Sequence, residues 1–264
     1  MVSSDLRRVG LEARAPHLRC SAGEVAPIVL LPGDPGRCDR IGQRLQDARE
    51  VAFNREFRTI TGSFRGVPVS ATSTGIGGPS TAIAAEELIR LGAKVLLRVG
   101  SCGGVQPGLA MGTVVIADSA SREDGTSRIY APDGFPAVAD PAMVLALQEA
   151  ANRHAPVSGG SGVITGVVRS HDSFYTDAEE ELMTRARALG VLASDMETAP
   201  LLVVARLRGV RAASILTVVV TAEGGLEEGI GEFAGGAETA VAGEARCIEV
   251  ALEACHQMWQ ESRR

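Results

Sequence analysis

The sequence lacks a long apolar run, an apolar leader segment and nearly all lysine. Its 264 residues are 45% hydrophobic and 22% charged, which suits one large buried core in a single domain. The longest apolar run, near residues 215–220, is too short for a membrane span, because a spanning helix needs about 20 apolar residues. The first twenty residues mix acids with arginines and do not match a secretory signal. We therefore expect a cytoplasmic protein with no membrane partner.

Metal-binding patterns of cysteine and histidine are also missing. The five cysteines are odd in number and form no CxxC pair, which argues against a disulfide framework and a zinc site. The four histidines show no i, i+4 spacing and no suitably placed acid. We expect reduced, mostly buried thiols and no metal.

The charge balance excludes one class of partner and favours another. A net charge of −6 would repel a polyanion, so we expect no nucleic acid. Lys94 is the only lysine, and every other basic residue is an arginine, whose planar fork suits phosphate and carboxylate groups. A GC-rich genome explains this bias as well.

The pattern of apolar residues predicts an α/β fold. Short stretches rich in β-branched residues alternate with longer segments of helical period. The expected strands are 26–31, 59–64, 67–73, 94–100, 112–117, 162–168, 191–194 and 212–220. The expected helices are 35–46, 79–91, 141–153, 177–189, 197–208 and 236–259. The glycine-rich segment 223–236 fits a lid over a site and a plain surface connection equally well.

Two glycine-containing turns lie between an expected strand and an expected helix. Residues 32–37, PGDPGR, can hold an anion on backbone N–H groups, with Arg37 one turn into the helix. Such turns are common, so this signal is weak alone. Residues 73–80, STGIGGPS, lack the third glycine and the acid of a dinucleotide-binding fingerprint. A P-loop is excluded too, because valine follows the only lysine.

Charged side chains in two apolar settings point to a ligand. Arg98 lies inside an apolar strand, where an arginine is costly unless an anion or a carboxylate pairs with it. A bound ligand and a buried Arg–Glu pair both satisfy it. Asp195 and Glu197 stand at a strand end, where a carboxylate can accept two hydrogen bonds from a ribose diol. Capping of the following helix is the alternative.

Taken in order, six blocks resemble the nucleoside phosphorylase family of hexameric purine nucleoside phosphorylases and uridine phosphorylases. The blocks are PGDPGR, NREF, STGIGGPS, LRVGSCG, SHDSFY and SDMETA. The resemblance implies a single α/β domain over residues 16–264, after a flexible extension of residues 1–15, with a central mixed, partly barrel-like sheet flanked by helices. It also implies a pentosyltransferase that uses phosphate as co-substrate, needs no cofactor, and assembles as dimers within a homohexamer.

The resemblance also assigns site residues by matching positions. The implied phosphate ligands are Gly33, Arg37, Arg98, Ser101 and, from a neighbouring subunit, Arg55. The implied ribose ligands are Met196, Glu197 and, across the dimer interface, His17. The implied base contacts are Cys102, Gly103, Phe174, Asp195, Val219 and Val220. Arg98 and Glu197 would be the catalytic pair, with arginines fixing the dianion while Glu197 orients the sugar.

The base end departs from the family pattern. Val219 and Val220 stand where purine members carry a Ser-Asp pair, and Ala178 and Glu180 stand where uridine phosphorylases carry a glutamine and an arginine. Asp195 replaces the usual glutamate. We therefore expect an atypical or intrinsically good leaving base and slow turnover of inosine, adenosine and uridine. The possible replacement acids are Glu180, Glu181 and Glu223.

Two rival functions stay open at this point. A nucleoside hydrolase of the same superfamily would need no phosphate arginines, whereas Arg37, Arg55 and Arg98 are all present. A catalytically weak nucleoside-binding protein would keep the fold without the proton donor. Phosphorolysis ranks first.

Overall fold

A computed structural model describes residues 14–154, 162–224, 231 and 238–262 of the chain. Its ten-stranded sheet has the order β10-β6-β8-β9-β5-β1-β4-β3-β2, with β7 paired to β6. The strands are β1 (Ile28–Leu31), β2 (Gln46–Asn54), β3 (Phe57–Phe64), β4 (Val67–Thr72), β5 (Val95–Gly104), β6 (Val114–Glu123), β7 (Ala137–Val138), β8 (Val163–His171), β9 (Ala193–Asp195) and β10 (Arg211–Val220). The helices are α1 (Pro35–Gly42), α2 (Gly78–Arg90), α3 (Gly125–Tyr130), α4 (Pro141–Arg153), α5 (Glu179–Ala188), α6 (Thr198–Arg208) and α8 (Glu238–Glu261).

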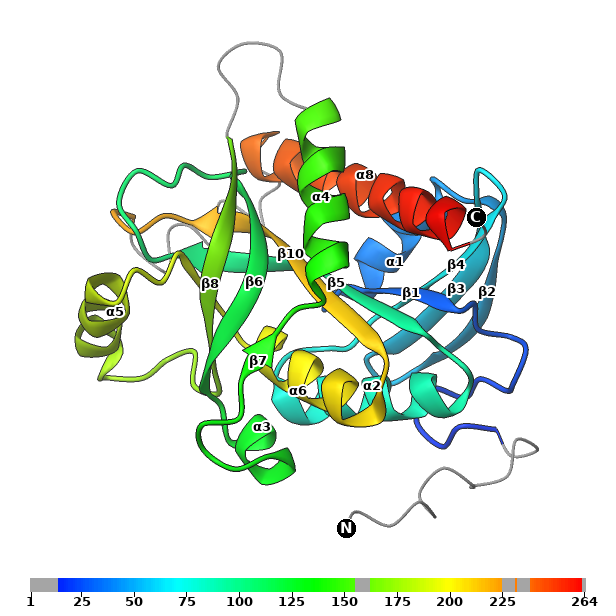
Figure 1. The fold of residues 1–264 in the computed structure, drawn as a ribbon, viewed down its shortest axis with the longest axis horizontal. Coiled ribbons are helices and arrows are strands. Elements are labelled where there is room, and N and C mark those ends of the chain that lie inside the picture. The colour runs from blue at the N-terminus through cyan, green and yellow to red at the C-terminus, as the bar shows by residue number, and fades with distance from the viewer. Residues whose placement is uncertain (1–13, 155–161, 225–230, 232–237, 263–264) are drawn as a thin grey trace.

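Half of the sheet closes into a barrel. β10 pairs with β6 on one side and with β5 on the other, so β5, β9, β8, β6 and β10 form a closed ring. β1, β4, β3 and β2 extend from β5 as an open sheet (Figure 1). The α/β class and the mixed, partly barrel-like sheet are confirmed.

Helices cover both sides of the sheet. α4 and α8 pack together on one side, and α2, α3 and α6 lie together on the opposite side (Figure 1). Local sequence explains their ends: Asp140 accepts a hydrogen bond from the Met143 N–H at the start of α4, and Gly209 ends α6 with a left-handed φ of 69°. No helix among the described residues is long and apolar enough to cross a membrane.

Three elements were not predicted from the sequence. The helix expected over 35–46 ends at Gly42, and β2 begins at Gln46. β2 is largely exposed and polar at its start, so it lacks the apolar alternation by which a half-buried strand is recognised. The short α3 and β7 were missed as well. The extension over 1–15 and the segment 223–236 lie mostly outside the described residues.

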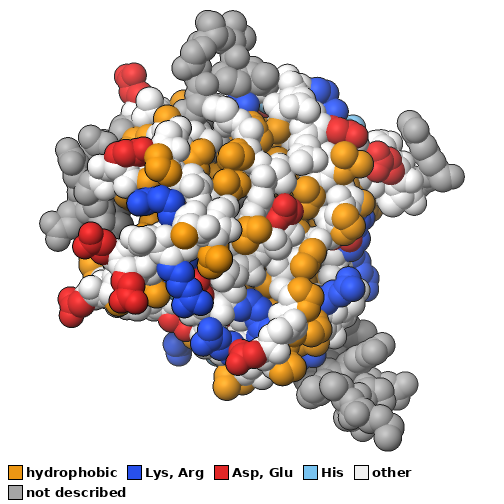
Figure 2. Space-filling view, turned by 60° about the vertical axis from the view of Figure 1, so that its left-hand side comes forward, with side chains coloured by type: hydrophobic (Ala, Val, Ile, Leu, Met, Phe, Trp, Pro, Cys, Tyr) orange, Lys and Arg blue, Asp and Glu red, His pale blue; other side chains and the backbone are white. Residues whose placement is uncertain are grey.

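The face shown in Figure 2 mixes apolar, basic and acidic side chains. A nucleic-acid-binding protein presents a basic patch or stripe instead. This face therefore offers no support for a polyanionic partner.

Candidate active site

The loops that follow β1 and β4 meet at one edge of the sheet. β1 pairs in parallel with β4 and with β5, so the carboxyl ends of these strands lie side by side. The Thr74 N–H donates to the Pro32 carbonyl at 2.8 Å, and the Gly75 N–H donates to the Gly33 carbonyl at 3.0 Å. A Cβ atom on Gly33 would lie 3.1 Å from the Gly75 oxygen, so glycine permits this close approach.

Arg37 and Ser101, two of the predicted phosphate ligands, are in direct contact. Arg37 Nη1 donates to the Val99 carbonyl and Nη2 donates to Ser101 Oγ, both at 2.8 Å. Glu244 of α8 lies 2.8 Å from Nη2, and it also pairs with Arg40. Within the described part of the chain, Arg37 Nε is buried without a hydrogen-bond partner. The guanidinium is therefore fixed at the end of β5 and still has an unused donor.

Arg98 holds both acids of the segment after β9. Its Nε lies 2.9 Å from Asp195 Oδ2, and its Nη2 lies 2.6 Å from Glu197 Oε2. The Gly77 N–H donates to the other Glu197 oxygen at 2.6 Å. The buried Arg–acid pair that the sequence left open is thus present. It does not exclude a ligand, because Glu197 lies directly after β9, where it meets the loop after β4 and the side chain of Arg98 on β5.

Asp195 and Glu197 have different local roles. Asp195 accepts hydrogen bonds from Ser170 Oγ at 2.6 Å and from the N–H and hydroxyl of Thr198 at 3.1 and 2.6 Å. Its side chain is 0% exposed, so protein donors occupy both of its oxygens. Glu197 makes no side-chain cap of α6. Helix capping therefore applies to Asp195 and not to Glu197.

Burial and charge shift the pKa values of this cluster. Burial raises the pKa of Glu197, Arg98 opposes that shift, and Asp195 adds to it. Burial alone would lower the pKa of Arg98, but Glu197 and Asp195 reverse the sign, so Arg98 stays charged. Burial also raises the pKa of Cys102 well above its usual value and that of Cys247 to about 11. Both thiols are therefore protonated at neutral pH.

The predicted base contacts gather around an open position on β5. Gly103 pairs with Val220 of β10 on one side and with Ser194 of β9 on the other. A Cβ atom on Gly103 would meet no atom of the described residues within 4 Å. Val219 falls in the register shift beside Val220. The strand face at Gly103 therefore has room for a flat ligand.

Two other predicted base contacts and one predicted ribose contact have different surroundings. Cys102 is 3% exposed and belongs to the hydrophobic core. Phe174 is 36% exposed and packs edge-on against the exposed Tyr175, with ring centroids 5.0 Å apart. Met196 is half-buried beside Glu197, as a residue beneath a sugar would be.

His17 and Arg55 form one patch beside the loop that follows β4, at the same edge of the sheet. His17 Nδ1 and Glu87 Oε1 are 2.6 Å apart, and Asn54 Nδ2 donates to the His17 carbonyl at 2.7 Å. Arg55 is exposed and has a left-handed φ of 55° in the turn between β2 and β3. The adjacent Glu56 accepts from Ser80 Oγ at 2.7 Å. The two residues predicted to reach a neighbouring subunit thus come from the same patch.

Known proteins share this architecture and much of this sequence. Residues 27–252 match the model of the phosphorylase superfamily. The chain belongs to this superfamily. It is 44% identical over 214 residues to a uridine phosphorylase of Thermococcus kodakarensis, covering 76% of each chain. It is 39% identical to a guanosine phosphorylase of Halorubrum lacusprofundi, covering 78% of this chain and 83% of the relative. The predicted nucleoside phosphorylase family and pentosyltransferase class are confirmed.

Solved structures agree with this assignment. A uridine phosphorylase from Vibrio fischeri superimposes with a TM-score of 0.85 at 34% identity, covering 93% of this chain and 98% of that one. A purine nucleoside phosphorylase from Toxoplasma gondii, in complex with immucillin-H, gives 0.84 at 30% identity, covering 96% and 99%. Relatives named for pyrimidine and for purine nucleosides are both similar, so similarity alone does not identify the base.

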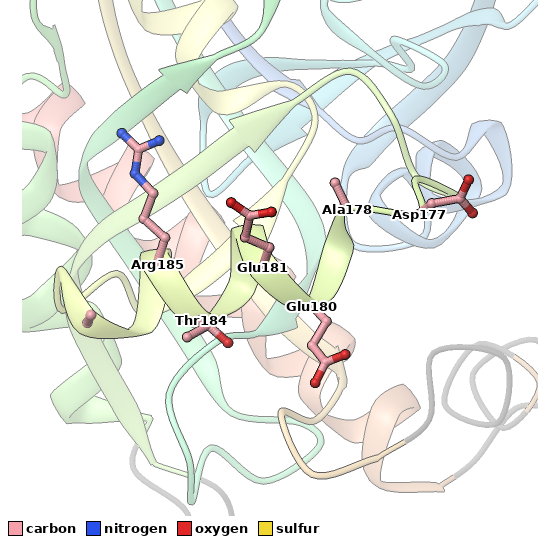
Figure 3. Close-up of a pocket in the computed structure, with 7 residues that line it drawn as sticks. Asp177, Ala178, Glu180, Glu181, Thr184 and Arg185 are labelled. Atoms are coloured by element: carbon pink, nitrogen blue, oxygen red, sulfur yellow. The ribbon is translucent and has the colours of Figure 1, made fainter.

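The three candidate replacement acids of this phosphorylase lie on exposed surfaces. Glu180 and Glu181 line a surface hollow on α5 together with Asp177, Ala178, Thr184, Arg185 and Ala188 (Figure 3). Glu223 is exposed and accepts from the Gly108 N–H at 2.8 Å. Ala178 and Glu180, which stand at the positions of the uracil-reading pair, therefore both line this surface hollow.

The sequence analysis missed two charged groups. Arg169 of β8 is 1% exposed and contacts Glu123, Glu179 and Ser194. Its signal was the same as that of Arg98, an arginine inside an apolar strand. The second group joins His154 to Glu249 and Glu253, whose ligand atoms lie within 4.8 Å of one another. It was missed because α4 and α8 are far apart in sequence. Arg44 and Arg65 already pair with its two carboxylates.

Proposed function

We propose that this phosphorylase cleaves the N-glycosidic bond of a nucleoside with inorganic phosphate, giving free base and pentose 1-phosphate. Phosphate would lie at the ends of β1 and β5, on the Gly33 N–H, Arg37, Arg98 and Ser101. Ser101 Oγ accepts its hydrogen bond from Arg37 and keeps its own hydrogen to donate to the dianion. Arg37 also has its unused Nε donor.

The observation that carries this proposal is the fixed carboxylate of Glu197. One oxygen accepts from the Gly77 N–H and the other pairs with Arg98, each at 2.6 Å. A carboxylate held this way can accept hydrogen bonds from the sugar hydroxyls without reorganising. Arg98 would then contact both the phosphate and Glu197, the residue that binds the sugar. One guanidinium would therefore position the nucleophile and the sugar. Met196 would pack beneath the sugar.

The role of Asp195 follows from its contacts. Its two oxygens are occupied by Arg98, Ser170 and Thr198. In this proposal Asp195 is a positioning residue, because it fixes the Arg98 guanidinium and leaves Glu197 to meet the substrate. The base would lie over Gly103, between Val219, Val220 and Phe174.

The complete site would form in a dimer. His17 and Arg55 lie in one patch of the protomer, beside the turn between β2 and β3. In a twofold dimer, one patch of each protomer can reach the site of the other. His17 Nδ1 is held by Glu87, which fixes the ring with Nε2 as the atom available to a sugar hydroxyl of the neighbour. The hexamer expected from the family would be built from such dimers.

The first experiment measures base release from purine and pyrimidine nucleosides, each with and without millimolar phosphate. Release that depends on phosphate supports the proposal. Release without phosphate would indicate a hydrolase, and no release with tight nucleoside binding would indicate a binding protein. Arg37→Gln should lower kcat/KM by roughly 10²-fold and raise the KM for phosphate. Arg44→Gln, an exposed arginine in the loop after α1, is the matched control.

The dimer is tested by complementation. Arg55→Ala and Glu197→Gln are each expected to be nearly inactive. In a mixed dimer, the Glu197 of one protomer and the Arg55 of the other complete one wild-type site. Co-expression of the two variants should therefore restore about a quarter of the wild-type activity. Absence of any recovery, with mixed oligomers verified by affinity tags, would contradict the shared site.

A further inference from the structure

Arg169 is a buried cation that the roles assigned so far do not use. It is 1% exposed on β8, and among the described residues its one short side-chain contact joins Nε to Glu123 Oε2 at 2.7 Å. Its Nη1 atom has three longer contacts, at 3.4 Å to Ser194 Oγ, 3.6 Å to Glu179 Oε1 and 3.8 Å to the Met183 sulfur. One half of the guanidinium is therefore well paired, and the other half can accept a better partner.

The register of the barrel places Arg169 in line with the base position. Val220 pairs with Gly103, Gly103 with Ser194, and Ser194 with Arg169. Residues directly paired across neighbouring strands share a face of the sheet. Ser101, two residues before Gly103 on β5, lies on that same face and contacts Arg37. One face thus runs from the phosphate end, past the open position at Gly103, to Arg169.

Glu179 supplies a matching acceptor. It is the first residue of α5, and its Oε2 atom is buried without a hydrogen-bond partner among the residues that the structure describes. Its neighbours Glu180 and Glu181 line the outer hollow of the same helix (Figure 3). Met183 also contacts Arg169, and a methionine side chain adapts readily to a ligand. Of the three consecutive glutamates, Glu179 is the one that contacts the barrel.

We propose that Arg169 and Glu179 together bind the edge of the base, and that this edge carries a keto oxygen beside a ring N–H. The guanidinium donates to the oxygen and the carboxylate accepts from the N–H, as uracil and 6-oxopurines allow and as adenine and cytosine do not. Glu123 positions Arg169 for this contact. The inference rests on the proposed function and names its substrate class. An ordinary keto base then replaces the atypical base expected from the sequence.

The same pair explains how a base leaves without the missing proton donor. The C1′–N bond breaks with its electron pair going to the base, while a phosphate oxygen forms the new bond to C1′. The negative charge on the base spreads to its keto oxygen, where Arg169 donates. The released base then takes a proton from water. A cation preorganised at a developing charge lowers the barrier, because it needs no reorganisation during the reaction.

The first test compares substrates on the wild-type enzyme. Uridine, inosine and guanosine should be cleaved at least about tenfold more efficiently, as kcat/KM, than cytidine and adenosine. Uridine should likewise exceed 3-methyluridine, which lacks the ring N–H, by at least about tenfold. Equal values for cytidine or adenosine would overturn the base assignment and leave the phosphorylase itself intact.

The second test uses a matched pair of variants at the same end of α5. Glu179→Ala should bring the ratio of kcat/KM for uridine over 3-methyluridine close to one, with the KM for phosphate unchanged. Asp177→Ala removes an exposed acid two residues away and should keep the wild-type ratio. Arg169→Met should lower kcat for uridine by roughly 10²-fold. An unchanged ratio in Glu179→Ala would contradict the proposal even if Arg169→Met failed to fold.

A failure of the proposed function can be distinguished from a failure of the base-edge contact. If no nucleoside releases base in the presence of phosphate, binding of free uracil and of cytosine is measured by calorimetry. Tighter binding of uracil that is lost in Glu179→Ala would still support the edge contact. Equal binding of the two bases would overturn it.

Discussion

Arg98 and Arg169 are both arginines inside barrel strands, yet their surroundings differ. Arg98 pairs with two nearly inaccessible carboxylates, Asp195 and Glu197, whose side chains are 0% and 7% exposed. Arg169 pairs closely with Glu123 and more loosely with Glu179, whose side chains are 33% and 31% exposed. The first cluster is fully enclosed by protein groups. The second one has partly exposed carboxylates, with Glu179 Oε2 itself buried, and a cation that is closely paired through Nε alone.

This difference in pairing fits two different proposed roles, in which Arg98 positions other groups and Arg169 recognises a ligand. A buried charge without its partner is far costlier than a buried pair, because the remaining ion keeps its desolvation penalty. Arg98 therefore has little freedom, which fits its proposed role of holding Glu197 and phosphate in place. Arg169 can exchange its long contacts for a ligand at low cost. Tightly paired, buried residues suit the binding of sugar and phosphate, which every nucleoside substrate shares. Loosely paired residues suit recognition of the base, which differs between substrates.

The largest expected effect compares the loss of each cation. Arg98→Met leaves Asp195 and Glu197 unpaired in the interior and should lower the free energy of unfolding by about 3–5 kcal/mol. Arg169→Met leaves two carboxylates that are about one-third exposed, and should cost less than about 2 kcal/mol. Urea denaturation of both variants at pH 7 measures the difference. Equal losses would show that the two clusters are not distinct.

Glu197→Gln should lower activity strongly, whereas its effect on stability should depend on pH. The variant loses the proposed charged acceptor for the sugar, so kcat/KM should fall by roughly 10²- to 10³-fold. Burial raises the pKa of Glu197, with Arg98 opposing and Asp195 adding to the shift. The stability from this group is therefore fully present below its unfolded pKa and is lost as pH rises.

The pH dependence gives the measurement. Glutamine resembles the protonated carboxyl group, so the variant's stability relative to wild type should rise between pH 4 and pH 8. Urea denaturation across that range checks the slope. A relative stability that falls with pH would show that the Arg98–Glu197 attraction outweighs burial.

A smaller effect is expected from Ser170, which joins the two clusters. Its hydroxyl donates to Asp195 Oδ1 at 2.6 Å and accepts from the Ala199 N–H at 2.9 Å. Ser170→Ala should cost about 1–2 kcal/mol by thermal or urea unfolding, since two buried partners lose a hydrogen bond. Ser173→Ala, an exposed serine three residues later, is the control. Activity should fall modestly on all nucleosides alike, since Asp195 positions Arg98 and not the base.

The sequence predicted the elements of the site better than their orientation. Arg98 stood out because a charge in an apolar strand needs a partner, and the same reasoning applies to Arg169, between Val168 and Ser170. It was passed over because the family resemblance located base recognition after β8. The exposed strand β2 was not predicted because its sequence shows no alternation of apolar and polar residues. Which member of the run 179–181 turns inward depends on where α5 begins, and a helix start is uncertain by several residues.

The smallest expected effect concerns the acids first considered as proton donors. Glu180 and Glu181 line the hollow on the outer side of α5, so their charges are hydrated and do not face the barrel. Glu180→Gln and Glu181→Gln should each change kcat/KM for uridine or inosine by less than about twofold, because exposed substitutions away from a site act weakly. Steady-state rates over pH 5–9 check this, since a proton donor would also remove one limb of the pH profile. A tenfold loss in either variant would move base recognition from Arg169 and Glu179 to the outer side of the helix, and the contrast between the two arginine clusters would lose its functional meaning.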